Sequence, residues 1–294
     1  MTTISWPEAA AFTLASAVKD AVAQFTAVGI DSARLDAEML MAETLRVERG
    51  RLYMNPDRAL DDAALARFRA LIARRARGEP VSYITGRREF WSLDFVVTPA
   101  VLTPRPETEL LVETAVELVS AKSPPRILDL GTGSGAIAVA LAKEIIGAEI
   151  VATDISREAL EIARANARRH GVEDRISFLA GDLFAPVADM RGAFDWIVSN
   201  PPYIRRDDIP ALPRDVRDFE PRIALDGGVD GLDFYRRIAG EAARYLSADG
   251  SIAVEIGAGM SAEVAGLFAD AGFADVRVEK DLAGLERVVT GVFR

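Results

Sequence analysis

Residues 127–135 have the sequence Ile-Leu-Asp-Leu-Gly-Thr-Gly-Ser-Gly. A short apolar run, typical of a buried strand, enters a turn with three glycines, and the apolar segment 136–143 that follows is typical of a helix. Glycine permits a tight turn and lets the backbone approach a ligand closely, because it carries no Cβ. The stretch therefore predicts a strand, a ligand-binding turn and a helix in succession.

The same alternation of strand and helix continues from about residue 107 to the end of the chain. Strands are predicted at 126–130, 149–153, 175–179, 194–199, 251–256, 276–280 and 287–293, and helices at 107–120, 136–143, 157–170, 234–245 and 261–271. Such alternation predicts a parallel, doubly wound sheet. The connection 282–285 is too short for a crossover helix, so the last two strands must be antiparallel. We therefore expect an α/β fold with a seven-stranded, doubly wound, Rossmann-like sheet whose last strand is antiparallel.

Acidic residues accompany the glycine turn. Asp129 precedes the turn, and Asp154 ends the next strand nineteen residues after Gly135, where a carboxylate suits the hydroxyls of a ribose. The spacing Gly-x-Gly-x-Gly differs from the dinucleotide pattern, Asp129 would repel a pyrophosphate, and no Gly-Lys-Ser/Thr follows. A cationic adenosine cofactor, S-adenosylmethionine (AdoMet), fits this acidic site better than NAD.

The end of the third strand adds Asp182 and Leu183 at the same edge of the sheet. We expect Asp182 to bind the adenine amine and Leu183 to contact the ring, and a plain loop aspartate is the alternative. The predicted cofactor-binding residues are Asp129, Gly131, Thr132, Gly133, Ser134, Gly135, Asp154, Ile155, Asp182 and Leu183, together with Arg105 and Asn200 from two other segments.

The tetrapeptide Asn200-Pro201-Pro202-Tyr203 follows the apolar strand 194–199. The Asn200 carboxamide offers an acceptor oxygen and an NH2 donor. The two prolines stiffen the loop and leave carbonyl oxygens free, and Tyr203 adds a flat aromatic face. Two acceptors and a stacking surface suit an NH2 group on an sp2 centre, either an amide or a nucleobase amine. In a doubly wound order this strand neighbours the one before the glycine turn, so we expect both to face one crevice and all four residues to be catalytic. An ordinary strand-to-loop exit is the alternative.

Composition excludes several kinds of chemistry. The chain of 294 residues has no cysteine and one histidine, His170, so disulfides, thiol nucleophiles, a Ser-His-Asp triad and a multi-histidine zinc site are not expected. We predict no metal site, and we expect His170 to cap the end of a helix before Gly171. A net charge of −10 argues against a duplex-binding surface, so we expect no direct binding of nucleic acid.

The first 80 residues carry no visible chemistry and are typical of a small helical bundle. One helix is predicted at 61–76, and another at 32–45 has an apolar face formed by Leu35, Met39 and Met41. Residues 1–8 lack the pattern of a signal peptide, and no apolar run is long enough to span a bilayer. We expect a monomer in the cytoplasm.

A break at Gly78-Glu79-Pro80 separates this bundle from the rest of the chain. The aromatic-rich segment that follows predicts a hairpin that turns near Ser92-Leu93-Asp94. We therefore expect a helical domain at 1–80 that binds a partner protein, a β-hairpin linker at 81–106 and a cofactor-binding domain at 107–294.

These motifs resemble those of the class I AdoMet-dependent methyltransferases and, more closely, those of the PrmC/HemK family. The matching segments are 83–86 with 89–90, 103–109, 129–135, 200–204, 219–221 with 224–225, 226–232 and 255–257. Pro-Arg-Pro-Glu-Thr-Glu at 104–109 and Phe-Glu-Pro at 219–221 are more discriminating than Asn-Pro-Pro-Tyr, which DNA adenine-N6 methyltransferases share. The chain departs from the family at Ser92, where glycine is usual, and at Met260, where glutamine is common.

The resemblance implies methylation of the glutamine side-chain nitrogen (N5) in the Gly-Gly-Gln motif of peptide chain release factors. We expect catalysis by positioning, in which Asn200 Oδ1 and the Pro201 carbonyl accept the two amide hydrogens and Tyr203 stacks on the amide. Arg105 and Glu107 would order a cofactor lid or the domain junction, or form an interdomain ion pair. The alternatives are a nucleic-acid adenine-N6 methyltransferase and a non-catalytic binding module with a methyltransferase fold.

Overall fold

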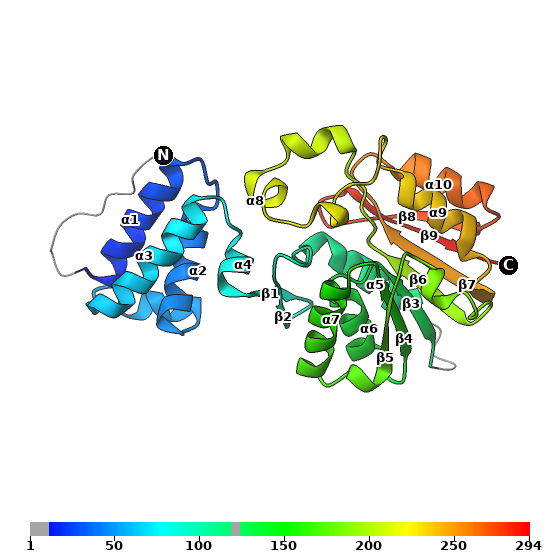
Figure 1. The fold of residues 1–294 in the computed structure, drawn as a ribbon, viewed down its shortest axis with the longest axis horizontal. Coiled ribbons are helices and arrows are strands. Elements are labelled where there is room, and N and C mark those ends of the chain that lie inside the picture. The colour runs from blue at the N-terminus through cyan, green and yellow to red at the C-terminus, as the bar shows by residue number, and fades with distance from the viewer. Residues whose placement is uncertain (1–11, 119–123) are drawn as a thin grey trace. The chain divides into compact units, whose positions relative to one another are not determined.

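The computed structural model describes residues 12–118 and 124–294. The chain forms two compact units: unit 1 comprises Met1–Gly86 and Arg214–Phe219, and unit 2 comprises Arg87–Pro213 and Glu220–Arg294. Figure 1 shows the helices of unit 1 that precede Gly86 in blue and cyan and the sheet of unit 2 from green to red. The parts of the predictions that fall on residues 1–11 and 119–120 lie outside the described residues.

Within the described residues, unit 2 contains a seven-stranded sheet in the order β5-β4-β3-β6-β7-β9-β8. Its strands are β3 (Arg126–Leu130), β4 (Glu149–Asp154), β5 (Ile176–Ala180), β6 (Phe194–Ser199), β7 (Leu246–Glu255), β8 (Ala274–Lys280) and β9 (Glu286–Val292). The strands from β5 to β7 are parallel, and β9 is antiparallel to both β7 and β8. The predicted doubly wound sheet with an antiparallel last strand is confirmed.

Helices cover both faces of this sheet (Figure 1). Alternate side chains of a strand point to opposite faces. On one face α5, α6 and α7 bury Ile127 and Ala253, and on the other α9 and α10 bury Leu128 and Val254. The bounds of these helices are α5 (Glu109–Leu118), α6 (Ala136–Glu144), α7 (Arg157–Arg169), α9 (Asp233–Ala242) and α10 (Ser261–Asp270). Short 3₁₀ helices of unit 2 are η2 (Pro106–Thr108), η3 (Glu173–Arg175), η4 (Ala185–Val187), η5 (Arg206–Ala211) and η6 (Arg222–Ala224).

Two sequence predictions for unit 2 differ from the structure at turns. β7 begins at Leu246 instead of 251. The sequence pattern missed its first residues because the segment around Asp249 (φ 61°) is polar and does not resemble a buried strand. The hairpin pairs β1 (Arg87–Phe90) with β2 (Leu93–Val96), so it turns at Trp91 and Ser92 instead of 92–94. Both turn residues have positive φ, 53° and 55°, as in the type I′ turns that are common in two-residue hairpins. His170 ends α7 as predicted, and its ring Nε2 lies 2.9 Å from the Asp94 carbonyl oxygen.

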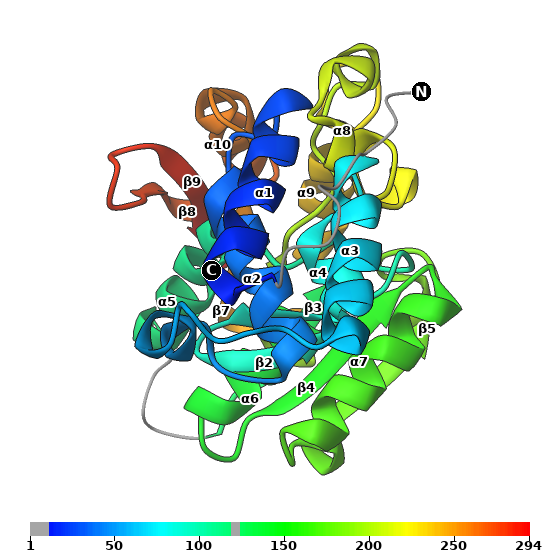
Figure 2. The same cartoon turned by 90° about the vertical axis from the view of Figure 1, so that its left-hand side faces the viewer.

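From residue 12 on, unit 1 packs three long helices against one another (Figure 2). Its helices are α1 (Leu14–Ala27), α2 (Ala33–Leu45), η1 (Arg49–Met54), α3 (Asp62–Ala76), α4 (Val81–Thr85) and α8 (Arg214–Arg217). The predicted apolar face of α2 is wrong at two positions, because Leu35 and Met39 are 45% and 39% exposed. The buried face of α2 instead runs through Ala37, Leu40 and Met41, whose spacing matches the helical repeat.

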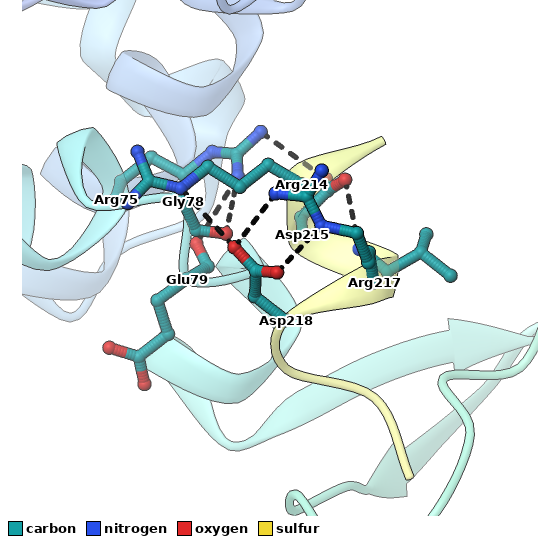
Figure 3. A network of polar contacts seen from close by, with 8 residues as sticks. Arg75, Gly78, Glu79, Arg214, Asp215, Arg217 and Asp218 are labelled. Carbon is teal, nitrogen blue, oxygen red and sulfur yellow. Dashed lines mark hydrogen bonds and ion pairs between the residues drawn. The ribbon is translucent and has the colours of Figure 1, made fainter. Parts of the chain in front are cut away.

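The segment Arg214–Phe219 joins unit 1 through the buried guanidinium of Arg75 (Figure 3). Arg75 Nε donates to Asp36 Oδ2 at 2.7 Å, and Arg75 Nη2 lies 3.5 Å from Asp215 Oδ2. A Cβ at Gly78, which has φ 98°, would lie 2.9 Å from the Arg214 Cδ. The chain therefore passes between the two units three times, at 86–87, 213–214 and 219–220.

Candidate active site

The glycine turn, residues 131–135, is held by the backbone of the neighbouring strand. The Gly131 and Thr132 amides both donate to the Thr153 carbonyl of β4, at 2.9 and 3.0 Å. Gly133 and Gly135 have φ of 55° and 81°, a region that side chains with a Cβ disfavour. A Cβ at Gly135 would also lie 3.0 Å from the Ala163 Cβ of α7. The turn therefore combines a left-handed backbone with close packing against α7.

Asp154 fixes the far side of the turn. Its Oδ2 accepts a hydrogen bond from the Gly133 amide at 2.9 Å, and its Oδ1 accepts one from the Ser156 amide at 2.8 Å. Burial raises the pKa of Asp154, while these two amide hydrogen bonds lower it. The carboxylate is thereby oriented at the wall of a cavity rather than left free to rotate.

One cavity of about 250 Å³ in unit 2 lies against this turn. The predicted cofactor-binding residues that line it are Arg105, Gly131, Thr132, Gly133, Ser134, Asp154, Ile155, Asp182, Leu183 and Asn200. Pro201 and Pro202 line it as well. The structure thus brings the glycine turn and the first three residues of the tetrapeptide around a single space.

Three predicted residues do not line that cavity: Asp129, Gly135 and Tyr203. Asp129 is fully buried on the face of the sheet that α6 covers, beneath the turn. Burial raises the pKa of Asp129 to about 7, and the nearby Asp154 adds to the rise, whereas the Thr132 hydroxyl and Ala138 amide lower it. Its carboxyl oxygens meet no partner of good hydrogen-bond geometry in the described part of the chain. Asp129 therefore lies below the turn instead of at the cavity.

Asp182 does line the cavity, but its carboxylate is already paired. The Arg237 guanidinium of α9 donates to Asp182 Oδ2 at 2.6 Å, and both side chains are partly exposed. Leu183 has an unusual φ of 46°, and its carbonyl accepts a hydrogen bond from the Thr153 hydroxyl at 3.1 Å. The sequence offered no signal for Arg237, because it lies 55 residues beyond its partner on another element.

The residues 200–203, which we call the clamp, continue directly from β6. The Ser199 hydroxyl donates to the Leu130 carbonyl at 2.8 Å, which ties the end of β6 to the end of β3. Asn200 Nδ2 donates to the Thr108 hydroxyl oxygen at 3.1 Å. Thr108 is a cavity-lining residue that the sequence reasoning missed as a partner, although it lies inside the Pro-Arg-Pro-Glu-Thr-Glu segment.

Tyr203 is positioned by glycines that come from two other segments. A Cβ at Gly257 would lie 3.0 Å from the Tyr203 Cδ2, and one at Gly227 would lie 2.7 Å from the Tyr203 Cα. Backbone hydrogen bonds from Ile204 N to Leu225 O (3.0 Å) and from Gly227 N to Ile204 O (2.8 Å) pin the loop that follows. Burial raises the pKa of Tyr203 to about 12, so its phenol stays neutral at physiological pH.

Two further polar side chains of unit 2, Arg105 and Asn166, hold segments that lie next to the cavity. Arg105 forms an ion pair with the buried carboxylate of Glu220, and both residues belong to unit 2. Asn166 of α7 is fully buried, accepts from the Val96 amide at 2.8 Å and donates to the Ser134 carbonyl at 2.8 Å. A polar amide between Ala163 and Ala167 on the apolar face of α7 was the signal that could have revealed it.

Comparison with known proteins decides the family. Residues 16–86 match the PrmC N-terminal domain, and residues 106–211 match the methyltransferase small domain. The chain is 48% identical over 263 residues to the release factor glutamine methyltransferase of Geobacter sulfurreducens. The aligned part covers 90% of this chain and 90% of the relative. The chain belongs to the release factor glutamine methyltransferase family.

A second relative agrees with this assignment, and one solved structure is similar in fold. The release factor glutamine methyltransferase of Agrobacterium fabrum is 43% identical over 268 residues, covering 90% of this chain and 92% of the relative. The fold is similar to that of a methyltransferase from Pyrococcus furiosus, with a TM-score of 0.50 and 19% identity over 68% of this chain and 88% of that one. No helix in the ranges 12–118 and 124–294 is long and apolar enough to cross a membrane.

Proposed function

We propose that this protein transfers the methyl group of AdoMet to the side-chain amide nitrogen (N5) of the glutamine in the Gly-Gly-Gln motif of peptide chain release factors. The observation that carries the proposal is that Asn200 lines the same cavity as the glycine turn, while its Nδ2 is engaged by Thr108. Its Oδ1 is therefore the atom left to accept a hydrogen from a substrate NH2 group. The names of the relatives supply the identity of the substrate protein.

The lining of the cavity fits AdoMet. Asp154 presents an oriented carboxylate for ribose hydroxyls, and Gly131 and Gly133 bring backbone without side chains to the wall. Ile155 and Ile223 line the cavity although each is 55% exposed, so they offer apolar surface that an adenine ring would cover. Asp182 would bind the adenine amine after exchanging its ion pair with Arg237, with Leu183 against the ring. When bound, AdoMet supplies the electrophilic methyl group.

The clamp compensates for a poor nucleophile. An amide nitrogen is unreactive because its lone pair is delocalised, so the residues of the site must aim it. Asn200 Oδ1 and the Pro201 carbonyl accept the two amide hydrogens, and Tyr203 stacks on the amide plane. Such orientation can contribute several kcal/mol, up to roughly 7–11 in the best intramolecular cases. The two hydrogen bonds also strengthen as the nitrogen becomes positive in the transition state.

The helical part of the chain would bind the release factor. A single glutamine offers too little surface for specificity, so residues 1–80 supply the remaining contact, with 81–106 as a linker and 107–294 as the catalytic part. The exposed apolar side chains Leu35 and Met39 on α2 support this role. We further propose a cytoplasmic monomer that does not bind nucleic acid directly, which the net charge of −10 supports.

One labelling experiment tests the function. The protein is incubated with isotopically labelled AdoMet, a release factor and DNA, and tandem mass spectrometry locates the label. The proposal expects label on the side chain of the Gly-Gly-Gln glutamine and on no base. Label on adenine would identify a nucleic-acid methyltransferase, and a protein that binds the release factor without labelling anything would be a binding module.

A further inference from the structure

The strand register places a buried glutamate beside the clamp. β6 lies between β3 and β7, and Ser199 is the Cα partner of Val254. The same parallel register, carried one residue further, sets Asn200 next to Glu255, the last residue of β7. Val198 and Ala253 point to the face that α5 covers, so alternation turns Asn200 and Glu255 to that same face.

The polar contacts agree with the register. Asn200 Nδ2 donates to the Thr108 hydroxyl oxygen at 3.1 Å, and the Glu255 carboxyl faces both that hydroxyl and the Asn200 carboxamide. Glu255 is only 2% exposed, and its Oε2 finds no hydrogen-bond partner of good geometry within the described ranges. A buried carboxyl without a full set of partners is costly for a fold, which favours a role beyond packing.

On the basis of the proposed function of the clamp, we propose that Glu255 is a positioning residue that fixes the orientation of the Asn200 carboxamide. A threonine hydroxyl has one hydrogen to donate. If Thr108 donates that hydrogen to the Glu255 carboxylate, its lone pairs can only accept, and the group they accept from is Asn200 Nδ2. A flipped carboxamide would set its oxygen against the same lone pairs. The relay therefore keeps Oδ1 directed at the substrate amide.

The charge state of Glu255 controls this relay. Burial raises the pKa of Glu255 to about 7; the Thr108 hydroxyl lowers it, the nearby Glu107 raises it, and Arg287 and Asn200 lower it. Tyr203 and Tyr235 also lie near, and the Tyr235 hydroxyl donates to the Glu255 backbone carbonyl at 2.8 Å. Below pH 7 the protonated carboxyl becomes a donor, and Thr108 is no longer forced to accept from Asn200. Methyl transfer should therefore fall as the pH drops through about 7.

The test measures methyl transfer to a release factor between pH 5.5 and 9 for the full-length protein and its variants. Glu255→Gln should reduce kcat by about tenfold, the equivalent of one neutral hydrogen bond, and should remove the inflection near pH 7. Thr108→Val should give the same loss, and Thr108→Ser should restore kcat because it returns the hydroxyl. The KM for AdoMet should change far less than kcat, since these variants leave the glycine turn unaltered.

Matched controls separate positioning from folding. Glu113→Gln removes an exposed carboxylate of α5, and Thr114→Val removes a buried hydroxyl of the same helix; both should keep the normal kcat and pH profile. The proposal is overturned if Glu255→Gln, or a folded Thr108→Val variant where Glu255→Gln does not fold, retains normal kcat with the inflection near pH 7. A wild-type protein that leaves the glutamine unmethylated would instead refute the proposed function itself.

Discussion

The glycine turn and the clamp line one cavity, but different kinds of contact hold them in place. The turn depends on two elements that come later in the chain: β4, through the Thr153 carbonyl and the Asp154 carboxylate, and α7, through close packing against Ala163. The clamp depends on segments that lie far from it in sequence, such as Thr108 and Gly257. The methyl-donor half is thus a local motif, whereas the acceptor half is assembled by the tertiary fold.

One buried carboxyl group lies next to the glycine turn and another lies next to the clamp. The two groups belong to the strands on either side of β6. Asp129 of β3 lies beneath the glycine turn, and Glu255 of β7 lies beside the clamp. Burial raises the pKa of both to about 7. The difference is in their neighbours: the Asp129 side chain faces the turn and α6, whereas Glu255 faces the side chain proposed to bind the substrate. Variants of the glycine turn should therefore lose AdoMet binding or stability, whereas variants of the clamp should lose kcat.

The largest expected effect is at the clamp. Asn200→Ala removes the acceptor that aims the substrate amide, and loss of one oriented hydrogen bond to a developing charge lowers kcat by roughly 10²–10³-fold. Methyl transfer to a release factor, followed with labelled AdoMet, measures this loss. Asn55→Ala, at an exposed asparagine of unit 1, is the matched control and should behave as wild type. Normal turnover by Asn200→Ala would contradict the clamp.

The buried carboxyls predict how stability depends on pH. Their folded-state pKa of about 7 lies above the unfolded value of about 4, so each stabilises the fold fully below pH 4 and loses that contribution as the pH rises through 7. The contribution is on the order of 4 kcal/mol per group. Asp129→Asn and Glu255→Gln should each flatten the fall in unfolding free energy between about pH 4 and pH 7, measured by urea denaturation. An unchanged slope would mean that the replaced group does not titrate there.

A pair of glycine variants tests the local character of the turn. Gly133 and Gly135 both have positive φ, but only at Gly135 would a Cβ meet another residue, Ala163. Gly135→Ala should lower the free energy of unfolding by about 1–3 kcal/mol more than Gly133→Ala does, because it also overpacks the contact with α7. Gly133→Ala should mainly weaken AdoMet binding, since its Cβ enters open space at the cavity wall. Chemical denaturation measures the loss of stability, and calorimetric titration measures AdoMet binding. Equal losses of stability in the two variants would contradict this view of the turn.

The smallest expected effect lies outside both halves, in the hairpin turn. Ser92 has φ 55°, a conformation that costs an L-residue roughly 1–2 kcal/mol, part of which glycine recovers. Ser92→Gly should therefore raise the unfolding free energy by up to about 1 kcal/mol without changing kcat. Ser177→Gly, at an exposed position within β5, should instead destabilise the protein. A decrease in stability for Ser92→Gly would show that the side chain makes contacts that outweigh the strain.

The contrast between the halves also explains what the sequence could predict. The strand, glycine turn and Asp154 follow one another in the chain, so composition and spacing were enough to find them. Thr108, Asn200 and Glu255 come close together only because β6 pairs with β7. No local sequence pattern predicts the register of that pairing. Asp129 was expected at the cofactor because it precedes the turn, but strand alternation directs it to the covered face. Leu35 and Met39 were misplaced because two helical faces of α2 carry apolar residues.

The most direct test of the account is the affinity of the Asn200→Ala variant for AdoMet, measured by calorimetric titration beside wild type and Gly133→Ala. Asn200 lines the cavity together with the glycine turn, so it could serve either half. We assign Asn200 mainly to the acceptor half, and predict that Asn200→Ala weakens AdoMet binding far less than Gly133→Ala does. If Asn200→Ala instead loses AdoMet as Gly133→Ala does, Asn200 belongs to the donor half and the division proposed for this site is wrong.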